Sequence, residues 1–415
     1  MNEPVQQLAT DPALGVIIFT LGGLAGAVFY LPFKKVKNWA WESYWAVYAV
    51  AGLVVVPWIL ALSTSPNLLA VLPKSPGNVL GFCFLCGAMW GLGGLTWGLM
   101  IRYLGVGLGL AIGCGLCSAA GTLIPPILKG QIHDLYGSPS ANASLLGVVI
   151  SVVGIIFVGM AGMSKESELP EEEKKKAVAE YSFKKGILVA IFSGLMSSGM
   201  SFGLQGGTVL EFKALHGSET TVVAGDVDHP PVEPAGAKFD KDAKVWYVPS
   251  AAASEKLTPK TWRGMPVLVV VLAGGFVINF LWCLFLNAKN KTFGDYARSG
   301  TPLAANVIFA GLAGAIWCSQ FICFKTGEPA MGERAYIGWA VLMASAILFS
   351  TLLGILLGEW KGTSGRTRGL LTLGLLLLLT SSGVAGYSGY AKQAPAEKPA
   401  AAQADWMTEP PPLRP

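Results

Sequence analysis

The chain has 415 residues, of which 53% are hydrophobic and only 13% are charged. A soluble globular domain carries about 25% charged residues, so this composition excludes an ordinary soluble protein and indicates a chain that lies largely in a lipid bilayer. The formal net charge of +5 reflects lysines and arginines placed around the membrane segments, and it does not predict binding to nucleic acid.

The first residues do not have the pattern of a secretory signal. Residues 1–13 contain Glu3 and Asp11 but no lysine or arginine, whereas a signal peptide has a positive region before its apolar core. The first apolar run is therefore predicted to be retained as a membrane helix.

Ten apolar runs follow one another along the chain, and each is close to the 20 residues that a helix needs to cross a bilayer. Their apolar residues are continuous rather than alternating, which favours helices over strands. The sequence therefore predicts an all-α membrane protein with ten transmembrane helices. The predicted helices are residues 14–33, 41–63, 78–101, 104–128, 144–163, 186–206, 265–287, 303–324, 335–357 and 369–388.

Polar segments divide these helices into two sets of five. Within the polar insert, Lys244–Val248 is predicted to form a short strand that ends at Pro249. The predicted organisation is a first five-helix repeat (14–163), a charged cytoplasmic connector (164–185), a second five-helix repeat (186–388) interrupted by an extracytoplasmic polar insert (207–264), and a disordered Ala/Pro-rich tail (389–415).

A short sequence echo relates the two sets of helices. The segment Gly87-Ala88-Met89-Trp90 in the third helix matches Gly314-Ala315-Ile316-Trp317 in the eighth, at an offset of 227 residues. Because each set has an odd number of helices, the second copy would be inverted in the membrane. Inverted repeats are typical of secondary transporters, which bind their substrate between the two halves near the middle of the bilayer.

The basic residues predict the orientation in the membrane. The segments after helices 1, 3, 5, 7 and 9 hold sixteen lysines and arginines, against four in the short segments after helices 2, 4 and 8. Cytoplasmic loops carry the excess of basic residues, so Lys34 and Lys174–Lys176 are predicted to be cytoplasmic. Both termini and the 207–264 insert are then extracytoplasmic, in a multi-pass protein of a bacterial inner membrane.

The sequence contains no pattern that predicts catalysis, a cofactor or a metal site. Cys83 and Cys86, like Cys114 and Cys117, are spaced so that they share one face of an apolar helix, where cysteine acts as a small hydrophobic residue. The Asp226, Asp228 and His229 group is interpreted as an exposed acidic turn. No nucleophile elbow, zinc-protease motif or phosphate-binding loop occurs, which indicates that the protein is not an enzyme.

Neutral polar and aromatic residues dominate the middle of the predicted helices, which contain no acidic residue there. Amides and hydroxyls exchange hydrogen bonds with an uncharged, hydroxyl-rich ligand, and aromatic faces cover its C–H surfaces. The predicted substrate-binding residues are Trp90, Trp97, Asn279, Trp317, Gln320 and Tyr336. Charged residues at helix ends are candidates for coupling or gating, namely Glu42, Arg102 and Glu333.

Several of these segments resemble the L-rhamnose–proton symporter family. The most specific is Pro32–Lys37 followed by Trp39, Trp41, Glu42 and Trp45. The others are Gly87–Gly91, Arg102–Gly105, Gly199–Phe202, Trp317 with Gln320 and Phe321, Tyr336 with Ile337 and Trp339, and Glu359 with Trp360. The resemblance implies the drug/metabolite transporter superfamily, a ten-helix inverted-repeat fold, and uptake of L-rhamnose with protons. The chain departs from the family in its long 207–264 segment and around Lys325–Glu333, which lacks the family's histidine.

The function predicted from these observations is secondary active import of a neutral monosaccharide by proton symport, and L-rhamnose is the expected substrate. The predicted partners are the sugar, the proton and the lipid bilayer. Nucleic acid is not a predicted partner, and the sequence leaves open whether the protein forms a homo-oligomer. Two alternatives stand beside it: export of a drug or metabolite, and a membrane sugar sensor whose 207–264 insert is the functional part.

Overall fold

In a computed structural model of the chain, residues 11–128, 135–168, 182–224, 238–240, 245–248 and 255–390 are described. Within these ranges, ten helical segments are long and apolar enough to cross a membrane, so the predicted all-α membrane fold is confirmed. The predicted Asp226/Asp228/His229 turn, most of the 164–185 connector and residues 391–415 lie outside the described part of the chain.

The first five spans come from residues before the connector. Span 2 contains a π-helical turn directly before Pro57, which has no backbone N–H to continue the α-helical pattern. The elements are α1 (Pro12–Val28), η1 (Pro32–Lys35), α2 (Trp41–Val50), η2 (Ala51–Val55), α3 (Val56–Thr64), α4 (Leu68–Val71), α5 (Gly77–Leu128) and α6 (Pro139–Glu168).

The second five spans follow the connector. Span 6 is built from three consecutive helices, which together run from Lys184 to His216. The elements are α8 (Phe183–Ser197), α9 (Gly199–Gly206), α10 (Thr208–His216), η4 (Lys260–Trp262), α11 (Met265–Asn290), η5 (Phe293–Tyr296), α12 (Leu303–Met331), η6 (Gly332–Ile337), α13 (Gly338–Leu356) and α14 (Gly365–Tyr390).

Helix α5 supplies both span 3 and span 4, because the chain doubles back inside it. A Cβ added to Gly113 would lie 2.9 Å from the sulfur of Met100 and 3.3 Å from the ring of Trp97. Residues 16 positions apart in a straight helix are about 24 Å apart, so the two halves of α5 must lie side by side. The two separate spans that the sequence predicts are therefore present, but without a non-helical break between residues 101 and 104.

Several helices extend further than the hydropathy predicts, and in two of them the extension carries charged residues into a helix. Span 6 continues through α10 to His216, although residues from 207 onward were expected in the polar insert. Helix α12 continues to Met331 rather than ending at residue 324. The prediction that Lys325 lies in a loop after the eighth helix is therefore wrong. Without Lys325, the segments predicted to be extracytoplasmic hold still fewer lysines and arginines, so the predicted orientation does not change.

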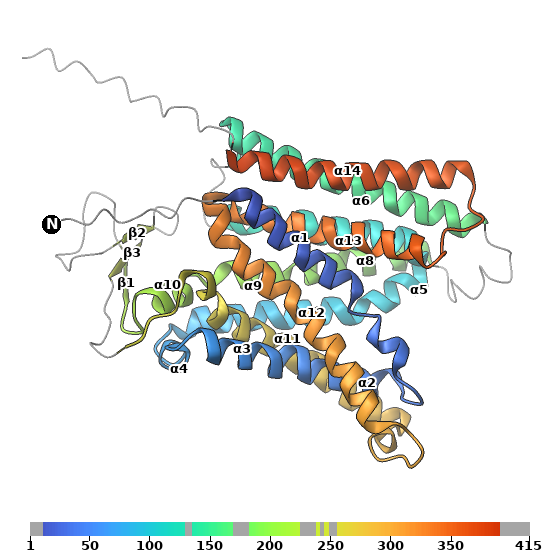
Figure 1. The fold of residues 1–415 in the computed structure, drawn as a ribbon, viewed down its shortest axis with the longest axis horizontal. Coiled ribbons are helices and arrows are strands. Elements are labelled where there is room, and N and C mark those ends of the chain that lie inside the picture. Colours follow the sequence, from blue (N-terminus) through green and yellow to red (C-terminus); the bar gives the residue numbers. More distant parts are fainter. Residues whose placement is uncertain are drawn as a thin grey trace, which may run out of the picture.

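The insert contains a small antiparallel sheet of order β1-β3-β2. Its strands are β1 (Thr221–Ala224), β2 (Lys238–Asp240) and β3 (Val245–Val248), so the strand predicted at Lys244–Val248 is confirmed. Val222 is paired with Tyr247, and Phe239 is paired with Trp246. The sheet lies at the same end of the bundle as α10 and α4, and this end is called here the insert end (Figure 1).

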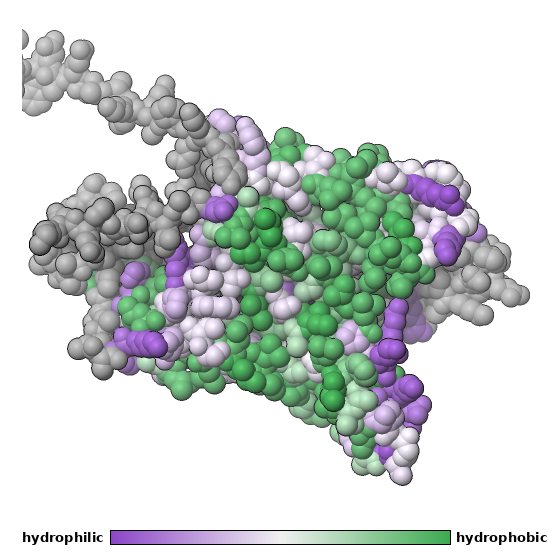
Figure 2. Space-filling model, viewed as in Figure 1, coloured by the Kyte–Doolittle hydropathy of each residue, from purple (hydrophilic) through white to green (hydrophobic). Residues whose placement is uncertain are grey.

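The opposite end of the bundle carries η1, η5 and the start of α2, with Lys34, Lys35 and Lys37, and is called here the lysine-rich end. Between the two ends, the outer surface is covered mainly by apolar side chains, and polar residues gather at the ends (Figure 2). This distribution matches a protein whose middle faces lipid and whose ends face water.

The packing of the first span resembles that of the sixth. Helix α1 lies against α12 and α13, which supply spans 8 and 9. Helices α8 and α9 contact both halves of α5, which supply spans 3 and 4: Gly199 lies against Trp90, and Gly194 lies against Gly113. Spans 2 and 7 pack on each other, as do spans 5 and 10. The contacts of span 1 with spans 8 and 9 therefore correspond to those of span 6 with spans 3 and 4. Spans 2 and 5 each pack against the equivalent span of the second half.

Candidate substrate site

Two tryptophans meet at the centre of the bundle. Trp90 lies near the middle of span 3 and Trp317 near the middle of α12. Their ring centroids are 4.9 Å apart and their planes are inclined by 34°. The ring of Trp317 also packs against the rings of Phe321 and of Tyr48 in α2, with ring centroids 4.7 Å and 5.8 Å away. Only 6% of the surface of Trp317 is exposed. The two residues that the sequence echo singled out are therefore brought into direct contact.

Two predicted amide residues lie at the same depth. The indole N–H of Trp45 donates a 3.2 Å hydrogen bond to Oδ1 of Asn279, whose own Nδ2 donates to the carbonyl of Gly275. Nε2 of Gln320 donates to the carbonyl of Trp317 at 3.0 Å. Both amides are nearly fully buried. Asn279 and Gln320 are thus held by hydrogen bonds around the Trp90–Trp317 pair.

Close helix crossings fix the positions of these tryptophans. Gly314, three residues before Trp317, lies so near span 2 that an added Cβ would be 2.5 Å from the carbonyl oxygen of Tyr48 and 2.8 Å from the nitrogen of Gly52. Gly87, three residues before Trp90, lies closer still to its neighbour, since an added Cβ would overlap the backbone carbonyl of Val271 in α11. Only glycine fits at either crossing, so each GAxW segment places its tryptophan through a backbone-to-backbone contact.

The other two predicted binding residues, Trp97 and Tyr336, differ in their surroundings. The indole N–H of Trp97 donates to Oγ of Ser197 at 2.8 Å, and its ring packs in a separate apolar cluster with Met100 and Leu104. Tyr336 lies in η6, between the ends of α12 and α13, where its buried hydroxyl has no hydrogen-bond partner among the described residues. The structure therefore places Trp97 in a separate cluster, whereas Tyr336 packs against the same hydrophobic core as the central pair.

The predicted gating residue Glu42 is part of a polar network at the lysine-rich end. Its buried carboxylate accepts hydrogen bonds from Nδ2 of Asn290 at 2.9 Å and from Oγ1 of Thr292 at 2.8 Å. These bonds join the start of α2 to the end of α11. Arg102 is exposed within α5, and the side chain of Glu333 in η6 lies outside the described residues.

Asp295 forms a second part of the same network. Its carboxylate accepts from the backbone N–H of Ala40 and from the hydroxyl of Ser43, each at 2.8 Å. The hydroxyl of Tyr296 donates to the carbonyl of Ser43, and burial raises the pKa of this phenol, which keeps it protonated as a donor. The lysine-rich end is therefore closed by hydrogen bonds between spans 2 and 7 and the η5 turn.

The insert end holds a charged cluster that the sequence did not reveal. The Lys325 ammonium pairs with both Glu211 and Glu328, and Arg263 pairs with Glu211 at 2.9 Å. Lys325 and Glu328 are nearly fully buried. Glu328 lies beyond residue 324, the predicted end of the eighth helix, and this predicted end is wrong because α12 continues through Glu328. The available signal was the three-residue spacing of Lys325 and Glu328, which places opposite charges on one helix face.

The charged cluster is separated from the tryptophan pair along α12. Lys325 lies eight positions after Trp317 along the chain, which corresponds to about 12 Å of helix. Lys325 is also only six residues from the end of α12, or about 9 Å. The cluster therefore belongs to the insert end, while the centre of the bundle is lined by aromatic rings and neutral amides.

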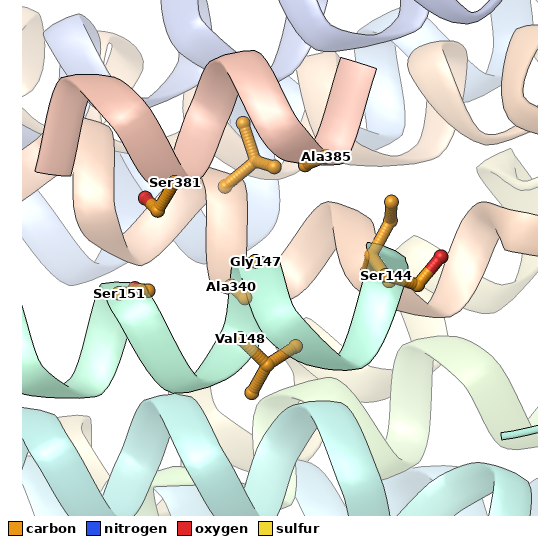
Figure 3. Close-up of a pocket in the computed structure, with 9 residues that line it drawn as sticks. Ser144, Gly147, Val148, Ser151, Ala340, Ser381 and Ala385 are labelled. Atoms are coloured by element: carbon orange, nitrogen blue, oxygen red, sulfur yellow. The ribbon is translucent and has the colours of Figure 1, made fainter. Parts of the chain in front are cut away.

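A small pocket lies elsewhere in the bundle, between α6, α13 and α14 (Figure 3). It is lined by small and apolar residues that include Ser144, Ser151, Ala340 and Ser381. It has room for about one water molecule, which is too little for a sugar. The pocket is therefore not a substrate site.

Comparison with known proteins places the chain in a family. A model of the family described as L-rhamnose-proton symport protein (RhaT) matches residues 9–225 and 231–391, which is most of the chain. The chain belongs to the L-rhamnose-proton symport protein family. This is a family of transporters, so the sequence-based expectation that the protein is not an enzyme is confirmed.

Individual relatives in this family match over nearly their whole length. The chain is 29% identical over 377 residues to the L-rhamnose-proton symporter of Cronobacter sakazakii, covering 90% of this chain and 96% of that one. It is likewise 29% identical to the symporter of Pectobacterium atrosepticum and 28% identical to that of Yersinia pestis, covering 90% of this chain and 97% of each relative. The family resemblance predicted from the sequence is confirmed.

Proposed function

We propose that this protein imports L-rhamnose across the bacterial inner membrane together with protons, by alternating access. Membership of the L-rhamnose-proton symport protein family supports this function, as do the names of the relatives. The observation on this chain that carries the proposal is the contact of Trp90 with Trp317 at the centre of the bundle. A rhamnose molecule has apolar C–H faces and a methyl group that suit aromatic rings.

The sugar would bind between the two tryptophan rings. Asn279 and Gln320 lie at the same depth and offer amide groups to its hydroxyls. Because the Trp317 ring is buried and touches Trp90, the sugar enters only when the helices that carry the two rings separate. Tyr336 remains a predicted contact of the sugar, whereas Trp97, which packs in a separate cluster, is not part of the site proposed here.

Opposed halves that separate and rejoin are what an inverted repeat provides. Two observations support two inverted five-helix repeats. Span 1 packs on spans 8 and 9 as span 6 packs on spans 3 and 4, and Gly87 and Gly314 each lie at a close helix crossing three residues before a tryptophan. In this proposal the lysine-rich end is cytoplasmic, and the network of Glu42 and Asp295 closes the inner side. The charged cluster then closes the outer side.

The proposal is tested by counterflow of labelled L-rhamnose in proteoliposomes that contain the purified protein, against a panel of competing sugars. Trp317→Ala should abolish counterflow, because it removes one face of the site. Trp282→Ala is the matched control, since Trp282 is 43% exposed on the outside of α11. Wild-type protein that exchanges no L-rhamnose, or a Trp317→Ala variant that exchanges it normally, would contradict the proposal.

A further inference from the structure

A buried lysine at the insert end is held by three acceptors. The Lys325 ammonium pairs with the carboxylates of Glu211 and Glu328 and donates to the carbonyl of Leu204 at 3.0 Å. An ammonium has three N–H donors, so each of them has a partner. Only 1% of the Lys325 side chain is exposed, against 11% for Glu211 and 7% for Glu328. This is a fully built site rather than a surface ion pair.

The cluster joins segments that are distant in the sequence. Glu211 belongs to α10, Lys325 and Glu328 belong to α12, and Arg263 follows η4. Gly264 makes room for the lysine, because a Cβ at that position would lie 3.0 Å from Cβ of Lys325. The charged contacts therefore hold spans 6, 7 and 8 together at their insert ends.

The charges of the described cluster balance. Among the described side chains, two cations, Lys325 and Arg263, face two carboxylates, Glu211 and Glu328, and the thiol of Cys83 in α5 lies near them. Adding one proton to a carboxylate removes its attraction for Lys325 and leaves the cluster with a charge of +1. A buried ion pair that loses one charged partner is strongly destabilised, so protonation and separation of the helices favour each other.

The two carboxylates are not equivalent. Glu211 pairs with both Lys325 and Arg263, so it keeps a cation when Lys325 moves away. Among the described side chains, Glu328 has Lys325 as its one ion-pair partner. A carboxylate that loses its neighbouring cation binds a proton more tightly. Glu328 is therefore the carboxylate whose proton affinity depends on whether the cluster is assembled.

We propose that Glu328 carries the coupled proton and that its bridge to Lys325 closes the extracytoplasmic side of the empty transporter. This inference rests on the proposed symport function and names the coupling site within it. Neither Glu42 nor Glu333, the acidic residues that the sequence suggested for coupling, is the proton carrier in this scheme.

The proton cycle follows from the contacts. A proton from water at the insert end forms an O–H bond with the Glu328 carboxylate, and the ion pair with Lys325 is lost, which allows α12 to separate from α10. Sugar bound between Trp90 and Trp317 draws the halves together again. The inner side then opens while Glu328 is still protonated, the sugar leaves, the O–H bond breaks, and the proton leaves to water on the cytoplasmic side. The Glu328 carboxylate pairs again with Lys325 in the empty transporter.

The test compares three variants of the full-length protein in proteoliposomes. Glu328→Gln removes the titratable group, Glu328→Asp keeps it, and Glu219→Gln is a matched control at an exposed carboxylate that pairs with Lys74. Two quantities are measured for each: counterflow of labelled L-rhamnose without a pH gradient, and accumulation of L-rhamnose with acid outside. With a gradient of about two pH units, one coupled proton per sugar supports accumulation of up to about 100-fold.

The expected result separates exchange from coupling. Glu328→Gln should retain counterflow but accumulate no L-rhamnose above the outside concentration, while Glu328→Asp and Glu219→Gln accumulate it. A Glu328→Gln variant that still accumulates L-rhamnose in the pH gradient would overturn the proposal. A monodisperse Glu328→Gln protein that also loses counterflow would overturn it as well, because the carboxylate would then serve sugar binding or structure. Wild-type protein without counterflow would instead reject the proposed function itself.

A measurement on the unmodified protein covers the case in which Glu328→Gln does not fold. The membrane-soluble reagent dicyclohexylcarbodiimide adds to protonated carboxylic acids, and mass spectrometry locates the adduct. Labelling should occur at Glu328 and increase as the pH falls. Absence of labelling at Glu328 over the whole pH range of transport would overturn the proposal.

Discussion

Replacing Gly314 by alanine should separate the two helices that position the tryptophan pair. The new Cβ would lie 2.5 Å from the carbonyl oxygen of Tyr48, about 0.9 Å short of the 3.4 Å at which ordinary contacts begin. Neither partner is a flexible side chain, since the second nearest atom is the nitrogen of Gly52. Spans 2 and 8 therefore have to move apart by almost an ångström.

The expected cost is that of an overpacked core, about 1–3 kcal/mol. Because Trp317 lies one helical turn from Gly314, the same shift should also weaken L-rhamnose binding, and a loss of about 1–3 kcal/mol in the site lowers the affinity by roughly 5- to 150-fold. Gly311→Ala is the matched control on the same helix, since its Cβ would meet only Ala51, at 3.7 Å.

Thermal unfolding in detergent measures the stability of both variants, and intrinsic tryptophan fluorescence measures their affinity for L-rhamnose. Gly311→Ala should match the wild type or be slightly more stable, because alanine favours a helix over glycine. Equal stability and equal affinity in Gly314→Ala and Gly311→Ala would refute the conclusion that the glycine crossing sets the distance between the tryptophan rings.

Two further predictions concern the polar networks at the ends of the bundle. Lys325→Met should lower the free energy of unfolding by about 3–5 kcal/mol, because it leaves two carboxylates buried without their shared cation. Adding Glu328→Gln to Lys325→Met should restore part of this loss in the thermal unfolding of the double variant, and a strictly additive double variant would argue against the pairing. Asp295→Ala removes the acceptor of Ala40 and Ser43 and should cost about 1–3 kcal/mol, which hydrogen exchange at the start of α2 would report. Arg298→Ala is its control, because that arginine is 58% exposed and its pair with Asp295 is weak, so similar exchange in both variants would contradict the prediction.

The sequence predicted the helical spans well because the bilayer imposes a simple requirement of length and apolarity. It also identified Trp90 and Trp317, since the GAxW echo marks matched places in two related halves. It did not predict that Trp97 packs apart from them, because a tryptophan at mid-span can face any neighbour. Which face of a helix meets which partner depends on the packing of all ten spans.

The charged cluster shows where hydropathy fails. A lysine after an apolar run looks like the start of a loop, so α12 was expected to end at residue 324, before Lys325. The countercharge that offsets the cost of burying the Lys325 ammonium comes in part from Glu211, which lies more than 100 residues earlier in the chain. Since Glu211 itself lay at the predicted edge of the insert, neither residue gave a reason to place the other inside the membrane.

Accumulation of labelled L-rhamnose by wild-type proteoliposomes, with acid outside and the interior buffered, tests the central claim of proton-coupled import most directly. The proposed function predicts that L-rhamnose reaches a higher concentration inside than outside, and that a protonophore abolishes the excess. Equilibration to equal concentrations, with no effect of the pH gradient on the final level, would contradict proton-coupled import.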